Sequence, residues 1–428
     1  MNSAVPRFGK QPGAAGTMFD GVDLEALARR IPTPFHTYSA SLIRERIASF
    51  KTALAGLDAL VCFAVKANPN VSILQLMADA GLGADIVSSG ELQRSLRAGI
   101  PRERIVFSGV GKSEPEIAEA LATGIARFNL ESRDELECLQ RLAGELGLTA
   151  HAAVRVNPDV DAGTHAKIST GKVENKFGVG MAQARSWFAD SAQFPNVHLD
   201  GLHVHIGSQI LALAPFKTAF EQVAEFEREL RAGGHAIENI DVGGGLGICY
   251  REGSERPVTL VAYIEMVRRA LSGFSGRIVL EPGRYLVADA GLLLTRVIRV
   301  KRGGQRDFLV LDAAMTELIR PSLYDAWHDI EPVAPSESPM TAYDIVGPVC
   351  ESSDTFARDR RLPRCAKGDL LMIRSTGAYG ASMASTFNSR PLATEVLLDN
   401  GRYAVVRRRQ TIEELLSGEV AAKTWQTA

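Results

Sequence analysis

Several reactive side chains in this sequence stand directly behind short apolar runs that are typical of buried strands. Lys66 is the first of them, at the end of the run Val61–Val65 and ahead of the turn-forming residues Asn68–Asn70. A lysine that follows an apolar strand and precedes polar residues is expected to have a lowered amine pKa. Such an amine can act as a nucleophile or form a Schiff base. The alternative is a lysine that only extends from a strand end into solvent.

Several later strand candidates also end in polar residues or in glycine. A purely structural sheet does not need a lysine, two histidines, a glycine triplet and a glutamate at one rim. The residues at these positions are Asp85, Arg155, His203, His205, Ser208, Gly243, Gly244, Gly245, Glu281, Gly283 and Arg284.

The glycine triplet Gly243–Gly245 offers three bare backbone units, whose N–H groups can turn together into a concave site for an anion. A dinucleotide fingerprint is excluded, because Ile248 stands where that motif needs Gly or Ala. The structural alternative is a tight turn, although one glycine would serve that purpose. The triplet therefore predicts a phosphate site after the seventh strand candidate.

Three further side chains narrow the choice of cofactor. His203 and His205 share a face on a strand, so they predict either a metal pair or an imidazole lying flat on a planar cofactor, with a hydrogen-bonded core histidine as the alternative for His203. A buried Glu281 needs a partner, such as a pyridinium nitrogen, or alternatively Arg284 or another barrel arginine. Lysine, glycine nest, imidazole and carboxylate together predict pyridoxal 5′-phosphate as the cofactor, and no resident metal.

The elements that must position these residues alternate between apolar runs and helix-period segments. Such alternation predicts parallel strands with crossover helices, and eight strand candidates over about 240 residues match a (β/α)8 TIM-type barrel, with an open doubly wound sheet as the alternative. The strand candidates are Leu60–Val65, Ala84–Val87, Ile105–Ser108, Ala126–Leu130, Ala152–Val156, Leu199–His205, Ile240–Val242 and Ile278–Leu280. The helix candidates are Val71–Ala80, Gly90–Ala98, Glu114–Ala122, Arg133–Leu146, Ala182–Ala192, Pro215–Ala232 and Thr259–Leu271.

After residue 290 the pattern predicts a second, mostly β domain without regular helices. Its strand candidates are Leu292–Val300, Phe308–Asp312, Asp344–Val349, Asp369–Ile373, Thr394–Leu398 and Tyr403–Arg407. Residues 1–43 are expected to form a mobile arm and a strand, Phe35–Tyr38, that joins this β domain, whereas 44–290 form the barrel and 291–428 complete the active site. A helix is expected near Asp23–Arg30, and Ser39 or Ser41 should cap another. The long polar segment Asn157–Gly180 is predicted to be an active-site loop.

Composition limits the partners and the compartment. A hydrophobic content of 46% predicts a sizeable core, and a net charge of −2 argues against nucleic acid or an anionic membrane as the main partner. Neither a secretory signal nor a membrane-spanning run is expected. Five scattered cysteines form no disulfide framework, which favours the cytoplasm.

Eight motifs resemble those of the barrel-type, fold-type III pyridoxal-phosphate decarboxylases, and among them the group that acts on diaminopimelate. The resemblance runs from about Thr33 to Leu416, and Ser353, Thr376 and Phe387 are the departures from the usual pattern. The motifs are FAVKAN at 63–68, GADIVSSGEL at 83–92, GLHVHIGSQ at 201–209, DVGGGLG at 241–247, LEPGR at 280–284, IRPSLYDAWH at 319–328, GPVCESSD at 347–354 and GAYGASMASTFNSRP at 377–391.

The resemblance implies a cofactor site. Lys66 would carry the cofactor as a Schiff base, His205 would stack on its ring, and Glu281 would pair with its ring nitrogen. Gly245 and its neighbours would hold the phosphate together with Ser208. The other cofactor contacts would be Asp85, Arg155, Gly283, Arg284 and Tyr379.

The resemblance also implies a substrate site and a reaction. Cys350 would be the proton donor, with a small buried apolar thiol as the alternative reading. Arg320 suits the distal carboxylate of meso-2,6-diaminopimelate and Glu351 its distal ammonium. The full set of substrate contacts would be Arg284, Arg320, Tyr324, Glu351 and Tyr379. Relatives are homodimers with shared sites, so Cys350 and Glu351 would come from the other subunit, and the product would be L-lysine, at the last step of its biosynthesis.

Four other functions compete with this one. Alanine racemase shares the barrel but uses a two-base exchange, which the segment GPVCESSD at 347–354 fits poorly. An ornithine- or arginine-type decarboxylase uses a substrate without a distal carboxylate, which would leave Arg320 idle. A barrel hydrolase would hold a metal on His203 and His205. A non-catalytic regulator is disfavoured, because Lys66, Glu281 and Cys350 are all retained.

Overall fold

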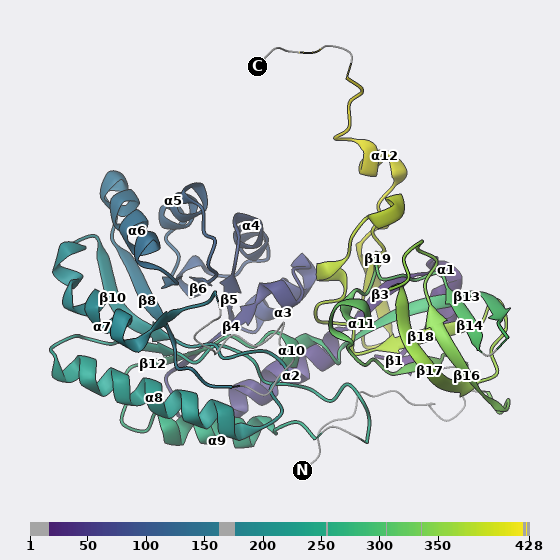
Figure 1. Ribbon diagram of the computed structural model, residues 1–428, viewed down its shortest axis with the longest axis horizontal. Coiled ribbons are helices and arrows are strands. Elements are labelled where there is room, and N and C mark those ends of the chain that lie inside the picture. Colours follow the sequence, from purple (N-terminus) through teal and green to yellow (C-terminus); the bar gives the residue numbers. More distant parts are fainter. Residues whose placement is uncertain are drawn as a thin grey trace. The chain divides into compact units, whose positions relative to one another are not determined.

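In the computed structural model of this protein, residues 17–161, 176–253, 256–304, 306–334, 336–422 and 425 are described. They form two compact units (Figure 1). The first consists of Ser39–Ala290 with Gly377–Ser382, and the second of the described residues up to Tyr38, Gly291–Thr376 and those from Met383 onward. The predicted N-terminal arm falls mostly on residues 1–16 and the predicted loop Asn157–Gly180 mostly on residues 162–175, both outside the described residues.

Eight parallel strands of the first unit form a closed barrel within the described residues, which confirms the predicted fold class. Neighbouring strands follow chain order, and the ring closes where β8 pairs with β10 and where β12 pairs with β4. The barrel strands are β4 (Ala59–Ala64), β5 (Gly83–Ile86), β6 (Ile105–Phe107), β7 (Arg127–Leu130), β8 (Ala150–Asn157), β10 (Val197–His203), β11 (Asn239–Asp241) and β12 (Arg277–Leu280); the short β9 (Val179–Gly180) pairs with the end of β8.

Helices connect the barrel strands and begin at residues that the sequence marks. Ser39, rather than Ser41, caps the first of them, because its side chain accepts the N–H of Leu42. In the same way Ser132 caps α6, and Gly147 ends that helix in the left-handed conformation with φ 64°. The helices are α2 (Ala40–Ala53), α3 (Val71–Asp79), α4 (Ser89–Arg97), α5 (Glu114–Thr123), α6 (Arg133–Leu146), α7 (Met181–Ala189), α8 (Leu213–Ala232), α9 (Leu260–Ala270) and α10 (Arg284–Val287).

The barrel strands are largely buried on both faces, as expected for a parallel sheet covered by helices. One close approach fixes the spacing of β8 and β10. A Cβ added at Gly201 would lie 2.9 Å from the Cβ of Ala153, so only glycine leaves room there, and the register of the pair shifts between Leu199 and Gly201. This packing brings the carboxyl ends of the strands to one rim.

The second unit is built on a β sheet in the order β17-β16-β14-β13-β3-β19-β20, with β18 paired to β13 and β15 paired to β18. The early strand β3 pairs antiparallel with β13 and so belongs to this sheet. The elements are β1 (Met18–Phe19), β2 (Val22–Asp23), α1 (Leu24–Arg30), β3 (Phe35–Ser39), β13 (Gly291–Arg302), β14 (Asp307–Leu311), α11 (Arg320–Tyr324), β15 (Ile330–Pro332), β16 (Met340–Val346), β17 (Thr355–Pro363), β18 (Leu370–Arg374), β19 (Thr394–Asp399), β20 (Arg402–Arg407) and α12 (Ile412–Leu416).

Some elements of the second unit differ from the prediction. The sequence does not predict β15 or β17, and α11 and α12 correct the expectation that no helices occur there. β17 reads as a charged loop, but it pairs antiparallel with β16 and leaves alternate side chains toward solvent. Among the described helices, none combines the length and the apolar character needed to cross a bilayer.

Candidate active site

Lys66 lies just beyond the first barrel strand, in the single helical turn Val65–Ala67 rather than on the strand itself. Its Nζ donates a hydrogen bond of 2.8 Å to Oδ2 of Asp85, which is fully buried on β5. β4 and β5 pair side by side, so the two side chains meet at the rim. The lysine side chain remains 38% exposed, which leaves its amine accessible to a ligand.

The prediction of a lowered amine pKa for Lys66 is wrong for the protein without cofactor. Burial lowers the pKa, but the carboxylates of Asp85 and Glu281 raise it, and the net result lies above the ordinary value for lysine. The sequence places Asp85 nineteen residues further on and does not show that the two groups meet at 2.8 Å. Lys66 is therefore an ammonium until a carbonyl compound reaches it.

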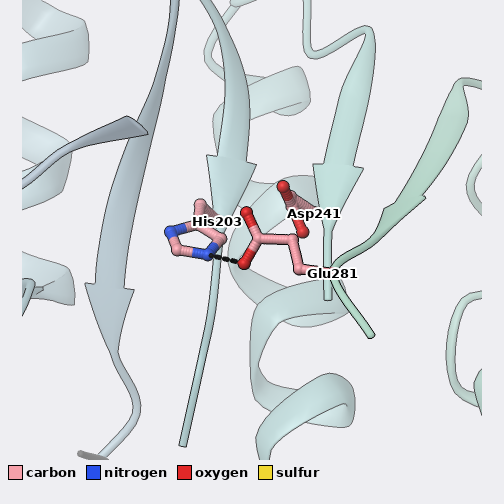
Figure 2. Close-up of side chains that lie close together, drawn as sticks. All are labelled: His203, Asp241 and Glu281. Atoms are coloured by element: carbon pink, nitrogen blue, oxygen red, sulfur yellow. Dashed lines mark hydrogen bonds and ion pairs between the residues drawn. The ribbon is translucent and has the colours of Figure 1, made fainter. Parts of the chain in front are cut away.

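Glu281 is the centre of a buried polar cluster (Figure 2). Its Oε2 lies 3.2 Å from Nε2 of His203, and its Oε1 accepts hydrogen bonds from Ser108 Oγ at 3.3 Å and Asn129 Nδ2 at 3.2 Å. Burial would raise the pKa of Glu281, but His203 and Lys66 lower it below the ordinary value. Within the described residues no arginine pairs with Glu281, so the alternative of a bridge to Arg284 is wrong.

Asp241 ends β11 beside Glu281 and has the opposite pKa shift. Burial raises its pKa well above the usual value, and the Glu281 carboxylate raises it further. Its Oδ1 accepts the N–H of Gly243 at 2.8 Å, so the acid also shapes the glycine turn. The opposite pKa shifts therefore favour the negative charge on Glu281 over one on Asp241.

The geometry does not reproduce the metal pair that the two histidines suggested. The potential metal-ligand group in the described residues joins His203 to Asp241 and Glu281, and His205 is not part of it. Nδ1 of His205 instead accepts the N–H of Gly244 at 3.1 Å. Burial lowers the pKa of His205 well below its usual value, so the ring is neutral and can lie against a planar group.

The glycine triplet has a packing role that the sequence did not reveal. A Cβ at Gly244 would lie 2.3 Å from the carbonyl oxygen of Glu281, and Gly243 and Gly245 have φ of +66° and +103°. The N–H groups of Gly243 and Gly244 already donate within the protein, to Asp241 and His205. The predicted anion nest is therefore only partly available, and Gly245 remains the candidate donor to a phosphate.

A cluster of polar side chains around Arg284 lies next to this turn. Arg284 donates to the hydroxyl of Tyr250 at 2.5 Å and to Oγ of Ser208 at 2.9 Å, and its guanidinium stands 4.8 Å from the ring centre of Tyr379. Tyr379 has φ +57°, and its N–H donates to the carbonyl of Ala67, which places it beside the lysine turn. This group offers a guanidinium and hydroxyl groups to an anion.

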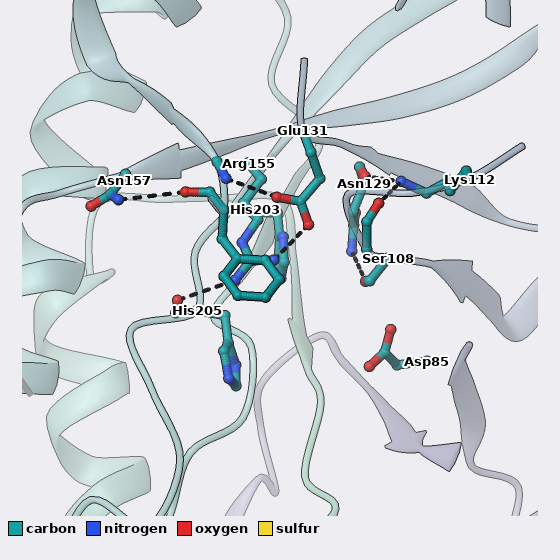
Figure 3. Close-up of polar contacts among 12 residues, drawn as sticks. Asp85, Ser108, Lys112, Asn129, Glu131, Arg155, Asn157, His203 and His205 are labelled. Atoms are coloured by element: carbon teal, nitrogen blue, oxygen red, sulfur yellow. Dashed lines mark hydrogen bonds and ion pairs between the residues drawn. The ribbon is translucent and has the colours of Figure 1, made fainter. Parts of the chain in front are cut away.

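Arg155 has a partner that the sequence did not predict. It donates to Oε1 of the buried Glu131 at 2.6 Å and to the carbonyl of His205 at 3.4 Å (Figure 3). Glu131 Oε2 also accepts the N–H of Gly178 at 2.8 Å. The Arg155–Glu131 pair therefore supports the backbone after the fifth and sixth barrel strands, and its contact with a cofactor stays a prediction.

Arg320 and Tyr324, predicted to bind substrate, begin and end α11 in the second unit. Arg320 is buried, and its Nη1 lies 2.8 Å from Nε2 of His328. Nδ1 of His328 lies 2.7 Å from the carbonyl of Arg374, so Nδ1 donates there and Nε2 accepts from the guanidinium. The imidazole thus fixes the orientation of Arg320.

Cys350 and Glu351 are exposed neighbours on the loop that joins β16 to β17. The loop is fixed by Asp354, a buried residue to which the sequence analysis gave no role. Its Oδ1 accepts the N–H of Met315 at 2.6 Å and its Oδ2 that of Val349 at 2.8 Å. The exposure of Cys350 argues against the reading of a small buried apolar thiol.

The sequence analysis missed Ser108, Asn129 and Asp241 on the barrel and Tyr250 beside Arg284. Ser108, Asn129 and Asp241 stand at or near the carboxyl ends of β6, β7 and β11, so the rule that found Lys66 could have found them. Tyr250 follows the glycine turn by several residues and had no such signal.

Comparison with known proteins agrees with this geometry. Residues 40–288 match the pyridoxal binding domain of the pyridoxal-dependent decarboxylases. Diaminopimelate decarboxylase of Zymomonas mobilis is 48% identical over 403 residues, which cover 94% of this chain and 96% of that protein. The enzyme of the same name from Pseudomonas aeruginosa is 47% identical over 400 residues, covering 94% and 96%. A crystal structure of diaminopimelate decarboxylase from Helicobacter pylori complexed with L-lysine has a TM-score of 0.89 at 43% identity, covering 92% of this chain and 98% of that one.

The match over residues 40–288, which span the closed barrel, makes this chain a pyridoxal-dependent decarboxylase. The identity to two curated enzymes over nearly the whole chain narrows the class further. The chain belongs to the diaminopimelate decarboxylase family.

Proposed function

We propose that this protein is a pyridoxal-phosphate-dependent carboxy-lyase that converts meso-2,6-diaminopimelate to L-lysine and CO2, the last step of lysine biosynthesis. The observation that carries the proposal is Lys66, paired with Asp85 at the mouth of the barrel above Glu281. The high identity to diaminopimelate decarboxylases supports the choice of substrate.

The residues present fit the cofactor at both of its ends. Ser208 and Arg284 offer an uncharged and a charged donor to a phosphate. Gly245 adds a backbone N–H, at a position where a Cβ would lie 2.5 Å from the carbonyl oxygen of Gly207. Glu281 keeps a negative charge in a buried site, where a protonated ring nitrogen is a suitable partner. When bound, the cofactor supplies the electron sink that takes up the charge left by the departing CO2.

Asp85 prepares Lys66 for its bond to the cofactor. Burial raises the pKa of Asp85, and Glu281 raises it further, while the ammonium of Lys66 lowers it. A carboxylate with a raised pKa at 2.8 Å can accept the proton of the ammonium and release a nucleophilic amine. Asp85 therefore holds Lys66 in place and takes its proton.

His203 and Asp241 keep the charge on Glu281 where a ring nitrogen needs it. The hydrogen bond from His203 lowers the pKa of Glu281, whereas the pKa of Asp241 is raised, so the negative charge is favoured on Glu281. His205, held neutral and oriented by the N–H of Gly244, provides a flat surface for the ring face. Arg155 supports that position through the carbonyl of His205.

The second unit would supply the substrate contacts and the proton donor. Arg320 would hold the distal carboxylate and Glu351 the distal ammonium, while Cys350 would protonate the carbon that loses CO2. Tyr324, Tyr379 and Arg284 would complete the substrate site. We propose that the protein acts in the cytoplasm as a homodimer, in which the partner subunit contributes Cys350 and Glu351.

The covalent role of Lys66 is tested by borohydride reduction of the holoprotein followed by peptide mass analysis. The cofactor should remain attached to the peptide that contains Lys66, and Lys66→Ala should lose this label and its visible absorption band. Lys217→Ala, which removes an exposed lysine on α8, is the matched control and should keep both. A label on any other lysine would refute the assignment.

Substrate choice is tested by measuring CO2 release from meso-diaminopimelate, L-lysine, ornithine and arginine. Only diaminopimelate should react well, and Arg320→Ala should raise its KM severely. An unchanged kcat/KM in Arg320→Ala, or faster turnover of ornithine or arginine, would favour the alternative decarboxylase. Cys350→Ala should slow turnover without loss of cofactor; a normal rate would mean that another group donates the proton.

A further inference from the structure

Two short segments of the second unit carry an unusual excess of positive charge. Residues 296–307 and 358–369 together contain ten Lys and Arg but only three Asp, in a chain whose net charge is −2. The first segment covers the end of β13 and the turn to β14, and the second covers the end of β17 and the turn after it. In each segment, most of the positive charges therefore have no negative charge to balance them within that segment.

The sheet brings these segments together. β13 and β17 belong to one sheet with β14 and β16 between them (Figure 1). The turn after β17 also contacts β13 directly, because the N–H of Gly368 donates to the carbonyl of Val297 at 2.8 Å. A groove of about 600 Å³ lies between them, within the size range of sites for small ligands. Its cationic lining residues are Arg299, Arg302, Arg364 and Lys367.

These four cations differ from Arg296 and Arg306 on the first segment. Arg306 pairs with Asp344 at 3.1 Å, and Arg296 donates to the carbonyl of Gly368 at 3.0 Å. None of the four lining side chains forms a hydrogen bond or an ion pair with any other residue in the described part of the chain, and Asp307 is the one acidic residue that lines the groove. Like charges left close together without partners favour an anionic ligand over an empty groove.

The rest of the groove is preformed and partly apolar. The N–H of Cys365 donates to the hydroxyl of the buried Tyr343 at 3.2 Å, and the N–H of Arg364 donates to the carbonyl of Pro339 at 3.0 Å, so the turn after β17 is fixed on the sheet. Val300 and Thr341 complete the lining with an apolar surface and a hydroxyl. The ring of a ligand could pack on these residues while its negatively charged groups contact the four cations of the groove.

We propose that this groove binds a small phosphorylated ligand with at least two negative charges, at a site separate from the barrel. Guanidinium groups bind phosphate through paired hydrogen bonds, and three of the four cations are arginines. The limited volume favours a small molecule over a nucleic acid, whose backbone needs a longer basic surface.

The test measures binding of inorganic pyrophosphate and of AMP to the full-length protein by calorimetry at constant ionic strength. Both should bind saturably at one site per chain, AMP gaining from contact of its ring with the groove. Replacing Arg299 and Arg364 together with Gln should weaken pyrophosphate binding by about a hundredfold, since each charged hydrogen-bonding group contributes about tenfold. Circular dichroism confirms that the variant is folded.

The matched control replaces Lys217 and Arg228 on α8 with Gln, which removes the same charge from exposed positions of the barrel unit. It should bind pyrophosphate as the unaltered protein does. Equal loss in the control, no saturable binding to the unaltered protein, or tighter binding of a single-stranded oligonucleotide that displaces pyrophosphate would each overturn the proposal. The readout is binding, so it does not depend on decarboxylase activity.

Discussion

His36 is expected to make the second unit less stable as the pH falls. Its ring is 1% exposed on β3, where it lies parallel to the ring of Tyr38 and within the field of Glu395 and Arg407. Burial lowers its pKa from 6.5 to about 4; Arg407 lowers it as well, and Glu395 raises it. His36 is therefore neutral in the folded protein at a pH where the unfolded chain already binds a proton.

The sign and size of the effect follow from these two values. Between pH 6.5 and about 4 the unfolded state binds more protons than the folded state, so the free energy of unfolding is highest above pH 6.5 and falls toward pH 4. For one group with these pKa values, the loss is about 2 kcal/mol at about pH 5 and approaches about 3.4 kcal/mol below pH 4.

The assay is urea unfolding at several pH values for the unaltered protein and for His36→Leu, with hydrogen exchange of the β13 amides that face β3 as a local probe. Leucine has a similar volume and does not titrate, so other groups cancel in the difference between the two proteins. His198→Leu, at an exposed histidine, is the control. A difference between His36→Leu and the unaltered protein that stays flat from pH 7 to pH 5 would refute the reasoning.

Three substitutions in and around the candidate site have separable effects. Gly244→Ala places a Cβ 2.3 Å from the carbonyl of Glu281, so the backbone there must shift, and cofactor affinity should fall at least about tenfold in an absorbance titration. Tyr250→Phe removes the hydroxyl that accepts from Arg284, which should weaken cofactor binding about tenfold and leave kcat nearly unchanged. Asp354→Asn deprives one backbone N–H of its acceptor at a cost of about 1–3 kcal/mol, so kcat/KM should fall about tenfold without loss of cofactor.

For each of these three substitutions, a control variant or a specific result can contradict the prediction. Gly273→Ala meets no atom within 4 Å, so it should bind cofactor normally, and equal losses at both glycines would remove the steric explanation. A lower kcat in Tyr250→Phe with unchanged affinity would place that hydroxyl near the reacting atoms instead. If Asp354→Asn retains full turnover, the loop of Cys350 does not depend on this carboxylate.

The barrel was predictable because its strands are apolar on both faces and its helices have clear ends. All eight strand candidates occur within a few residues of their predicted positions, and α6 has the predicted limits because Ser132 and Gly147 mark them. β17 was missed for a physical reason: Arg358 and Arg361 face solvent, and only the pairing of this segment with β16 makes it a strand.

The candidate site was predictable in its members but not in its electrostatics. Strand ends gave Lys66, Asp85 and Glu281, yet the sign of the lysine pKa shift depends on a distance between strands that no sequence pattern contains. The same limit applies to the opposite pKa shifts of Glu281 and Asp241, because the two carboxyl groups meet only when the barrel closes.

The turn that carries Lys66 is held by hydrogen bonds to residues that are translated much later in the chain. The carbonyl of Ala67 accepts from the N–H of Tyr379 and from Oγ of Ser382, while Nδ2 of Asn68 donates to the carbonyl of Gly377. A growing chain on the ribosome contains every barrel strand once Leu280 has emerged, but it cannot yet form these three hydrogen bonds. Pyridoxal phosphate should therefore bind to Lys66 only after the second unit has been translated. Fragments that end before residue 377 should lack the visible absorption of the bound cofactor.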